Sequence, residues 1–446
     1  MSDEREEARD VEPALDAPED APEDAPRQLA EAGVGDTSGT QPGPPRRRGE
    51  GLRRLLGSLV LPLLALFSAF VVGGVIIIAS DAQVIGRIGT DPLGALVLGL
   101  STVVDAYTAL IRGALGDPVQ IASAIASFDG LALRRSLGPI SETILSSTPL
   151  ILTGLAVALA FRAGLFNIGA EGQLQAGALL AVLVGFSLVG LPWFVHLPLA
   201  LLAGAVGGAL WGFLPGLLKA RTGAHEVITT IMLNFIAFRL VDYSLRTPLF
   251  QRPGRSDQIS KIVEPTATLN PILDGLRAHW GIAVALLAAI AVSWLLFRST
   301  KGFEFRAVGL NPQAARYAGM SIARTVVMSM MAAGALAGLA GATVVLGTTR
   351  TMTPGLAGGA GFDGIAIALL GRARPAGVVA AAFLIGGLRA GATPMQAATG
   401  IPIHLVVVIQ ALVIMFIAAP ALVRAIFRIR AERQIGAEAF AKGWGA

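Results

Sequence analysis

Long apolar runs separated by short polar connections dominate the chain after residue 54. A helix needs about 20 apolar residues to cross the ~30 Å hydrocarbon core of a bilayer, so each long run is a candidate span. The pattern predicts an all-α polytopic membrane protein. Ten membrane segments are expected, at Leu55–Ala79, Ile140–Phe161, Leu174–Leu191, Leu197–Leu218, Val227–Leu245, Gly281–Phe297, Val326–Leu346, Phe362–Leu370, Ala376–Arg389 and Ile403–Ile426.

Two segments fit this pattern less well. Phe362–Leu370 is too short to cross the core alone as a helix, so we expect a half-span or part of a broken helix that is covered by protein. The stretch Pro92–Leu115 carries Asp105 and Arg112 among its apolar residues. We expect this stretch to form a helix at the outer membrane surface.

Composition agrees with a membrane protein. Only 15% of the residues are charged and the mean hydropathy is +0.67, whereas soluble domains carry about 25% charged residues. The absence of cysteine excludes disulfides, thiolate catalysis and cysteine metal sites. The high proportion of glycine inside the spans, as at Gly204, Gly207 and Gly208 and at Gly334, Gly338 and Gly341, indicates closely packed helices.

Charge is unevenly distributed along the chain, and together with the apolar content it indicates three parts. Residues 1–40 have a net charge of −10, and the remaining residues have a net charge of +15. Residues 1–50 contain almost no large apolar side chains and are expected to form a disordered acidic, proline-rich tail. Residues 51–430 form the expected membrane domain, and residues 431–446 form a short C-terminal tail.

The basic residues cluster beside the predicted spans, and cytoplasmic loops carry such an excess. We therefore expect both termini in the cytoplasm and no nucleic-acid partner. The clusters are Arg46, Arg47, Arg48, Arg53 and Arg54; Lys219 and Arg221; Arg298, Lys301, Arg306, Arg316 and Arg324; Arg372 and Arg374; and Arg424, Arg428, Arg430 and Arg433.

Several kinds of chemistry find no support in the sequence. No Gly-Lys dipeptide occurs, so the Walker A loop that would bind ATP is absent. The four histidines are scattered and no H-E-x-x-H pattern occurs. We expect neither a metal nor a cofactor nor an enzymatic site, which leaves transport or scaffolding.

Two polar segments interrupt the apolar pattern. In 161–173, Asn167, Glu171 and Gln173 cluster with three glycines, and the break either lines a polar cavity or forms a hairpin in which Glu171 pairs with Arg162. In 222–234, Glu226 lies in the first turn of a predicted helix, where the dipole favours its charge. Asn234 lies two turns deeper and needs a partner in the bundle or a pore.

A third segment, 302–320, lies in a predicted cytoplasmic loop. Asn311 can cap a short helix that has Pro312 at its first position and ends at Gly319. This helix suits docking to a soluble partner, and an amphipathic connector is the alternative.

Four blocks together resemble the permeases of bacterial ABC importers for nucleosides, within the wider set of permeases for ribose-type sugars and branched-chain amino acids. The blocks are FRAGLFNIGAEGQ (161–173), TGAHEVITTIMLN (222–234), GFEFRAVGLNPQAARYAGM (302–320) and GFDGIAIALLGRARPAG (361–377). The resemblance covers roughly residues 55–430.

The resemblance implies a multi-pass permease in the cell membrane with several partners. These are cytoplasmic ATP-binding subunits, a second and different permease subunit, and an extracytoplasmic solute-binding lipoprotein. It also implies that the short cytoplasmic helix couples the permease to the ATPase. The residues carried over to this coupling helix are Asn311, Pro312, Ala315, Arg316, Tyr317 and Gly319.

The nucleoside is expected to meet neutral donors and acceptors in a mostly apolar path. The candidates for this substrate pathway are Asn167, Glu171, Gln173, Glu226 and Asn234. A permease for ribose-like sugars or another small polar solute is the alternative within the class. A stand-alone ion-coupled transporter would show inverted repeats, and no convincing repeat is present. A structural scaffold fits poorly with the polar breaks.

Overall fold

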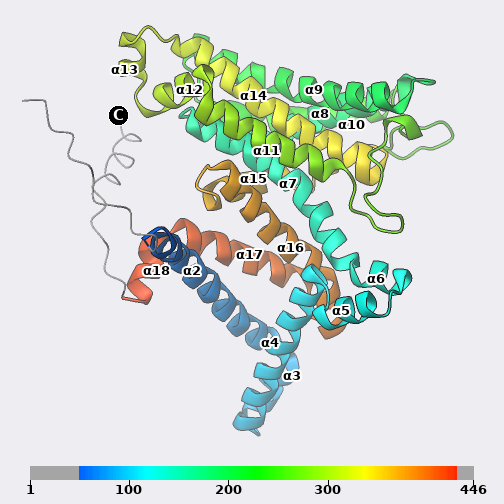
Figure 1. The fold of residues 1–446 in the computed structure, drawn as a ribbon, viewed down its shortest axis with the longest axis vertical. Coiled ribbons are helices and arrows are strands. Elements are labelled where there is room, and N and C mark those ends of the chain that lie inside the picture. The colour runs from blue at the N-terminus through cyan, green and yellow to red at the C-terminus, as the bar shows by residue number, and fades with distance from the viewer. Residues whose placement is uncertain (1–49, 429–446) are drawn as a thin grey trace, which may run out of the picture. The chain divides into compact units, whose positions relative to one another are not determined.

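The computed structural model describes residues 50–428, and these are almost entirely helical, with no strand among them (Figure 1). The prediction of an all-α polytopic fold is confirmed. The helices are α2 (Glu50–Ser80), α3 (Ala82–Ile88), α4 (Pro92–Leu115), α5 (Pro118–Ala126), α6 (Gly130–Ser136), α7 (Gly138–Arg162), α8 (Ala170–Ser187), α9 (Trp193–Thr222), α10 (Glu226–Leu245), α11 (Gly281–Arg298), α12 (Thr300–Leu310), α13 (Pro312–Tyr317), α14 (Ile322–Thr343), α15 (Ala360–Leu370), α16 (Pro375–Thr399), α17 (Ile403–Ala418) and α18 (Pro420–Ile426), with a 3-10 helix η1 (Pro265–Ala267) and a π-helix η2 (Val344–Thr349).

The predicted tails fall almost wholly outside the described residues. The acidic tail 1–50 contributes only Glu50, where α2 begins, and the C-terminal tail 431–446 lies beyond the described range. The arginines of the first basic cluster, at 46–48, also lie outside it.

Within the described range, eight helices are long and apolar enough to cross a membrane, by length and composition. They are α2, α4, α7, α9, α10, α11, α14 continued by η2, and α16. The predicted short segment Phe362–Leu370 is the 11-residue helix α15. The helix expected at Pro92–Leu115 is confirmed as α4, but it also qualifies as a span, so its position at the outer surface stays a prediction.

One predicted segment end is wrong, and one predicted segment is interrupted. The segment expected to stop at Arg389 continues to Thr399 as α16, because the charge of Arg389 is paired with Asp363 inside the bundle. The segment expected at Ile403–Ile426 is interrupted at Ala419, where Pro420 begins α18. Proline has no N–H to donate to the preceding turn, so it starts a helix more readily than it continues one.

The close packing expected from the glycines occurs between α9 and α14, which Figure 1 shows side by side. A Cβ on Gly338 would stand 2.2 Å from the carbonyl oxygen of Gly204, and one on Gly208 would stand 2.1 Å from that of Gly334. Only glycine permits such an approach of two backbones. Gly207 and Gly341 instead pack against α8, beside the carbonyl oxygens of Ala176 and Leu174.

Several basic segments meet at one end of the bundle. The backbones of Gly164, after α7, and Gly309, in α12, are in direct contact. Arg162 donates from Nε to the carbonyl oxygen of Ala373 over 3.0 Å, which joins the 371–374 turn to the same end. We call this the α13 end. Two of the predicted basic clusters, those at 298–324 and 372–374, therefore lie at the same end, while the orientation of this end in the membrane stays a prediction.

The opposite end is formed by the start of α7 and the long connection 246–280. The Ser141 hydroxyl accepts from the backbone N–H groups of Arg277, at 3.0 Å, and Ala278, at 2.7 Å. His279 is buried beside η2, and burial lowers its pKa to about 4. Its ring is neutral at pH 7, so its Nδ1 can accept from the Gly281 N–H at 3.1 Å.

Candidate functional site

The break between α7 and α8 is held by a buried pair of amide side chains. Asn167 donates from Nδ2 to Gln173 Oε1 over 2.9 Å, and Gln173 donates back from Nε2 to Asn167 Oδ1 over 3.2 Å. Asn167 Oδ1 also accepts from the Gly169 N–H at 3.0 Å. Both side chains are fully buried. Because buried amides are costly unless paired, this ring of hydrogen bonds fixes the irregular backbone where α8 begins.

Asn234 reaches the same break from α10. Its Oδ1 accepts from the Gly172 N–H at 2.9 Å, and its Nδ2 donates to the Ile168 carbonyl at 3.0 Å. Gly172 is required here, because an added Cβ would stand 3.1 Å from the Asn234 Cα and 3.1 Å from the Trp211 indole nitrogen. The structure therefore brings Asn167, Gln173 and Asn234 into one network across α8 and α10.

Glu226 lies at the edge of this network, in the first turn of α10 as expected. Its Oε2 accepts from Lys219 Nζ at 2.5 Å, and its Oε1 lies 3.5 Å from the Phe166 N–H. The preceding residue, His225, makes no side-chain cap. Glu226 thus ties the end of α9 to the break after α7, in addition to its favourable place at the helix start.

Glu171 points away from this network, toward α15. Its Oε2 accepts from the Gly361 N–H at 2.8 Å. The backbone N–H groups of Gly359 and Phe362 also stabilise the negative charge of the carboxylate. The positive end of a helix stabilises a carboxylate placed there. The predicted pairing of Glu171 with Arg162 is wrong, since Arg162 binds the turn after α15.

Two charged residues that were not among the candidates complete this region. Arg389, on α16, forms an ion pair with Asp363, on α15, and the charge of Arg389 also acts on Glu171. About a third of each paired side chain is exposed, 33% for Arg389 and 31% for Asp363. Their position inside predicted membrane segments was the available signal, because charges there are rare and mark functional or structural sites.

Besides Asp363 Oδ2, which lies in the ion pair with Arg389, two buried polar atoms have no hydrogen-bond partner within residues 50–428. They are Gln175 Oε1, on α8, and Trp211 Nε1, on α9. The Trp211 nitrogen lies beside Gly172 and thus beside the amide network. Gln175 lies within one helical turn of Gln173. Neither residue was predicted, because both lie inside segments expected to be membrane spans.

The short helix expected at 311–319 is confirmed as α13. Asn311 Oδ1 accepts from the Ala314 N–H at 3.0 Å, Pro312 opens the helix, and Gly319 follows it with φ of +79°. The chain also forms a helix before it, α12, which was not predicted. Ala315 is buried, whereas Tyr317 is 94% exposed. Figure 1 shows α13 at the tip of its end of the bundle, so the exposed Tyr317 is available there.

No three His, Asp or Glu side chains between residues 50 and 428 come together in a way that could hold a metal ion. The polar groups of the site are amides, paired charges and backbone amides. Such groups can bind a small solute by hydrogen bonds.

Comparison with known proteins places the chain among permeases. Residues 140–418 match the family described as branched-chain amino acid transport system / permease component. The chain is 44% identical over 349 residues to the guanosine ABC transporter permease protein NupP of Bacillus subtilis, which covers 75% of this chain and 94% of that protein. No solved structure matches the chain.

Two other relatives are similar over most of their length. The nucleoside ABC transporter permease protein NupB of Lactococcus lactis is 35% identical over 370 residues, 81% of this chain and 90% of NupB. The glucose ABC transporter permease protein TsgB13 of Haloferax volcanii is 36% identical over 367 residues, 80% and 86% of the two chains. In the first two organisms a second, more distant permease also matches.

Proposed function

The chain belongs to the permease family of branched-chain amino acid transport systems, and on this premise we propose that it is the membrane-spanning subunit of an ABC importer for nucleosides. The observation that carries this proposal is the 44% identity over nearly the whole length of a protein named as a guanosine permease. A second protein named as a nucleoside permease supports the same substrate class.

A small sugar is the second candidate substrate. The relative from Haloferax volcanii is named as a glucose permease and is as similar to this chain as NupB is. Sugars and nucleosides share the hydroxyl groups that neutral donors and acceptors bind. Substrate assignment therefore needs both solutes in one assay.

The chain needs partners to act as an importer. It has no Gly-Lys dipeptide, so we assign ATP hydrolysis to separate cytoplasmic subunits. We assign the second half of the membrane channel to a different permease, a role supported by the two matching permeases in B. subtilis and in L. lactis. An extracytoplasmic lipoprotein would deliver the solute.

We propose α13 as the contact with the ATPase. The capped, six-residue helix is anchored by buried Ala315 and leaves Tyr317 exposed at the tip. Arg316 adds a cation beside this ring, and aromatic and arginine side chains are enriched in protein interfaces. Asn311, Pro312 and Gly319 would fix the ends of the helix so that its motion is transmitted to α12 and α14.

We propose that the substrate pathway passes the break between α7 and α8. The amides of Asn167, Gln173 and Asn234 shape its polar wall. The free indole N–H of Trp211 beside this wall offers a donor that nothing else in the described chain uses. Glu226 and Glu171 would hold α10 and α15 against the break from its two sides.

Alanine at Asn234 tests this pathway. The substitution leaves the Ile168 carbonyl and the Gly172 N–H unpaired, which costs about 1–3 kcal/mol for each buried group. We expect the initial rate of nucleoside uptake to fall at least about tenfold, and the same for Asn167→Ala. The exposed Asn270, in the 246–280 connection, provides the matched control Asn270→Ala. Normal uptake by both network variants, at equal amounts in the membrane, would contradict the pathway.

Uptake of labelled nucleosides by strains with and without this gene tests the function itself. We expect nucleoside uptake to require the gene and ATP, and unlabelled guanosine to compete while glucose does not. Competition by glucose alone would favour the sugar permease. Uptake driven by an ion gradient without ATP would exclude the importer.

A further inference from the structure

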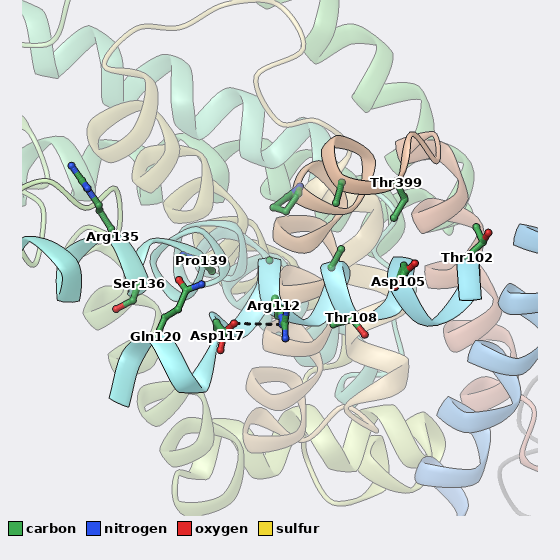
Figure 2. A pocket seen from close by; sticks show the side chains of 14 residues that line it. Thr102, Asp105, Thr108, Arg112, Asp117, Gln120, Arg135, Ser136, Pro139 and Thr399 are labelled. Atoms are coloured by element: carbon green, nitrogen blue, oxygen red, sulfur yellow. Dashed lines mark ion pairs between the residues drawn. The ribbon is translucent and has the colours of Figure 1, made fainter. Parts of the chain in front are cut away.

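A cavity of about 690 Å³ lies among α4, α5, α6 and α16 (Figure 2). It reaches Ser136 and Pro139, where α7 begins, so it opens at the end of the bundle opposite α13. Its lining is polar at Thr102, Asp105, Thr108, Arg112, Asp117, Gln120, Arg135 and Thr399, and its apolar part includes Ala109, Pro139, Pro394 and Ala398. None of these residues belongs to the site described above.

The helix α4 that forms its longest wall has three distinct faces. Small residues such as Gly99, Ala106 and Gly113 are buried against neighbouring helices. At the 3.6-residue period of a helix, a second face carries exposed Leu93, Val97, Leu100, Val104 and Ile111. A third face carries Ser101, Asp105, Thr108 and Arg112, which Figure 2 shows along the cavity from Asp105 onward.

The polar face is not suited to lipid. Within residues 50–428 the Asp105 carboxylate has no hydrogen-bond or ion-pair partner. Arg112, in contrast, lies 3.6 Å from Asp117 Oδ2 (Figure 2). An unpaired carboxylate in an apolar helix is costly in a bilayer and by default faces water or a solute. The second exposed face can meet lipid, so the third face is left for the cavity.

We propose that this cavity is an entrance site for the transported nucleoside, in which Asp105 binds the vicinal hydroxyls of the ribose. The inference rests on the proposed function. The volume lies within the range of small-molecule sites. A carboxylate can accept from ribose hydroxyls, as acidic residues do in dinucleotide sites. Arg112 supplies donors for a base carbonyl, and Pro139 and Pro394 supply apolar surface.

The position of the cavity fits this role. A solute delivered outside the cell meets the end of the permease that faces away from the ATPase, and α13 marks the ATPase end in the proposed assembly. The cavity lies at the other end, with Thr399 of α16 and Ser136 before α7 at its rim. A solute that the lipoprotein releases into this cavity would meet Asp105 as its unpaired carboxylate, because Asp117 is paired with Arg112.

The variant Asp105→Asn tests the site in the complete importer with its lipoprotein and ATPase. It removes the charge but keeps the shape, and Asp105 bonds nothing in the fold. We expect uptake of a ribonucleoside to fall about tenfold, the loss typical of one hydrogen bond to a charged group. Uptake of the 2′-deoxynucleoside with the same base should fall much less. The ratio of the ribonucleoside rate to the deoxynucleoside rate should therefore decrease.

The control is Asp129→Asn, at the cap of the neighbouring helix α6, where asparagine also caps well. It should leave both rates unchanged. Ala398→Trp, which fills the cavity from α16, should lower uptake of both substrates. Equal loss for both substrates in Asp105→Asn, or no loss, overturns the site. Absence of any nucleoside uptake in the unaltered importer would instead overturn the proposed function.

Discussion

Replacing Arg389 with methionine is expected to destabilise the folded permease more than any other single substitution of a charged residue in the bundle. The change leaves Asp363 without its ion-pair partner and removes the cation that also acts on Glu171. Breaking a fully buried ion pair costs about 3–5 kcal/mol. Because about a third of each side chain in this pair is exposed, we expect roughly 2–3 kcal/mol here. Because methionine keeps most of the side-chain volume, the loss of stability measures the effect of removing the charge.

Thermal unfolding of the purified permease in detergent measures this effect. The matched control is Arg255→Met, because Arg255 pairs with Asp257 in the 246–280 connection, outside the spanning helices, where both side chains are 51% exposed. Such an exposed pair contributes little to stability. Adding Asp363→Asn to Arg389→Met should recover much of the loss, since the unpaired carboxylate is removed. Equal stability of Arg389→Met and Arg255→Met would show that the ion pair does not hold α15 to α16.

Replacing both Arg316 and Tyr317 with alanine is expected to abolish transport without harming the fold. Tyr317 is 94% exposed and Arg316 is also exposed, so their loss removes little packing. Surface changes of this kind usually alter stability by less than about 0.5 kcal/mol. If α13 contacts the ATPase, two central interface side chains are lost, and each can be worth about 2 kcal/mol or more.

The assay compares ATP-driven uptake with the amount of ATPase that copurifies with the permease. We expect uptake at background and weaker ATPase retention, with the permease still inserted in the membrane. Arg255 and Ile262, exposed in the 246–280 connection at the opposite end of the bundle, give a control double variant that should retain the ATPase. Normal transport by the Arg316 and Tyr317 variant would place the coupling contact elsewhere in the chain.

Local sequence signals predicted much of the fold. Asn311, Pro312 and Gly319 predicted the ends of α13, because a cap, a fixed φ and a positive φ each act within a few residues. Gly204, Gly208, Gly334 and Gly338 predicted close helix contact, because backbones approach only where side chains are absent.

Local signals did not predict the interactions of residues whose partners lie far away in the sequence. A charge ended the predicted segment at Arg389, but Asp363 pairs with this charge and α16 continues for ten residues. Arg162, close in the sequence, was one predicted partner of Glu171. The Glu171 carboxylate instead accepts from the N–H of Gly361, 190 residues away. The partners in each pair are far apart in the sequence, so no periodic pattern of residues indicates that they meet.

The sequence by itself determined the membrane class, most of the spanning helices, the short capped helix and the polar segments at 161–173 and 222–234. These features follow from hydropathy and from contacts between residues close in the chain. Only the tertiary structure decided which polar groups meet. It joined Asn234 to the break after α7, Glu171 to the start of α15, and Asp105 to a cavity shared by four helices. Buried polar groups must find partners wherever the packing of helices provides them, and that packing is settled by the whole bundle.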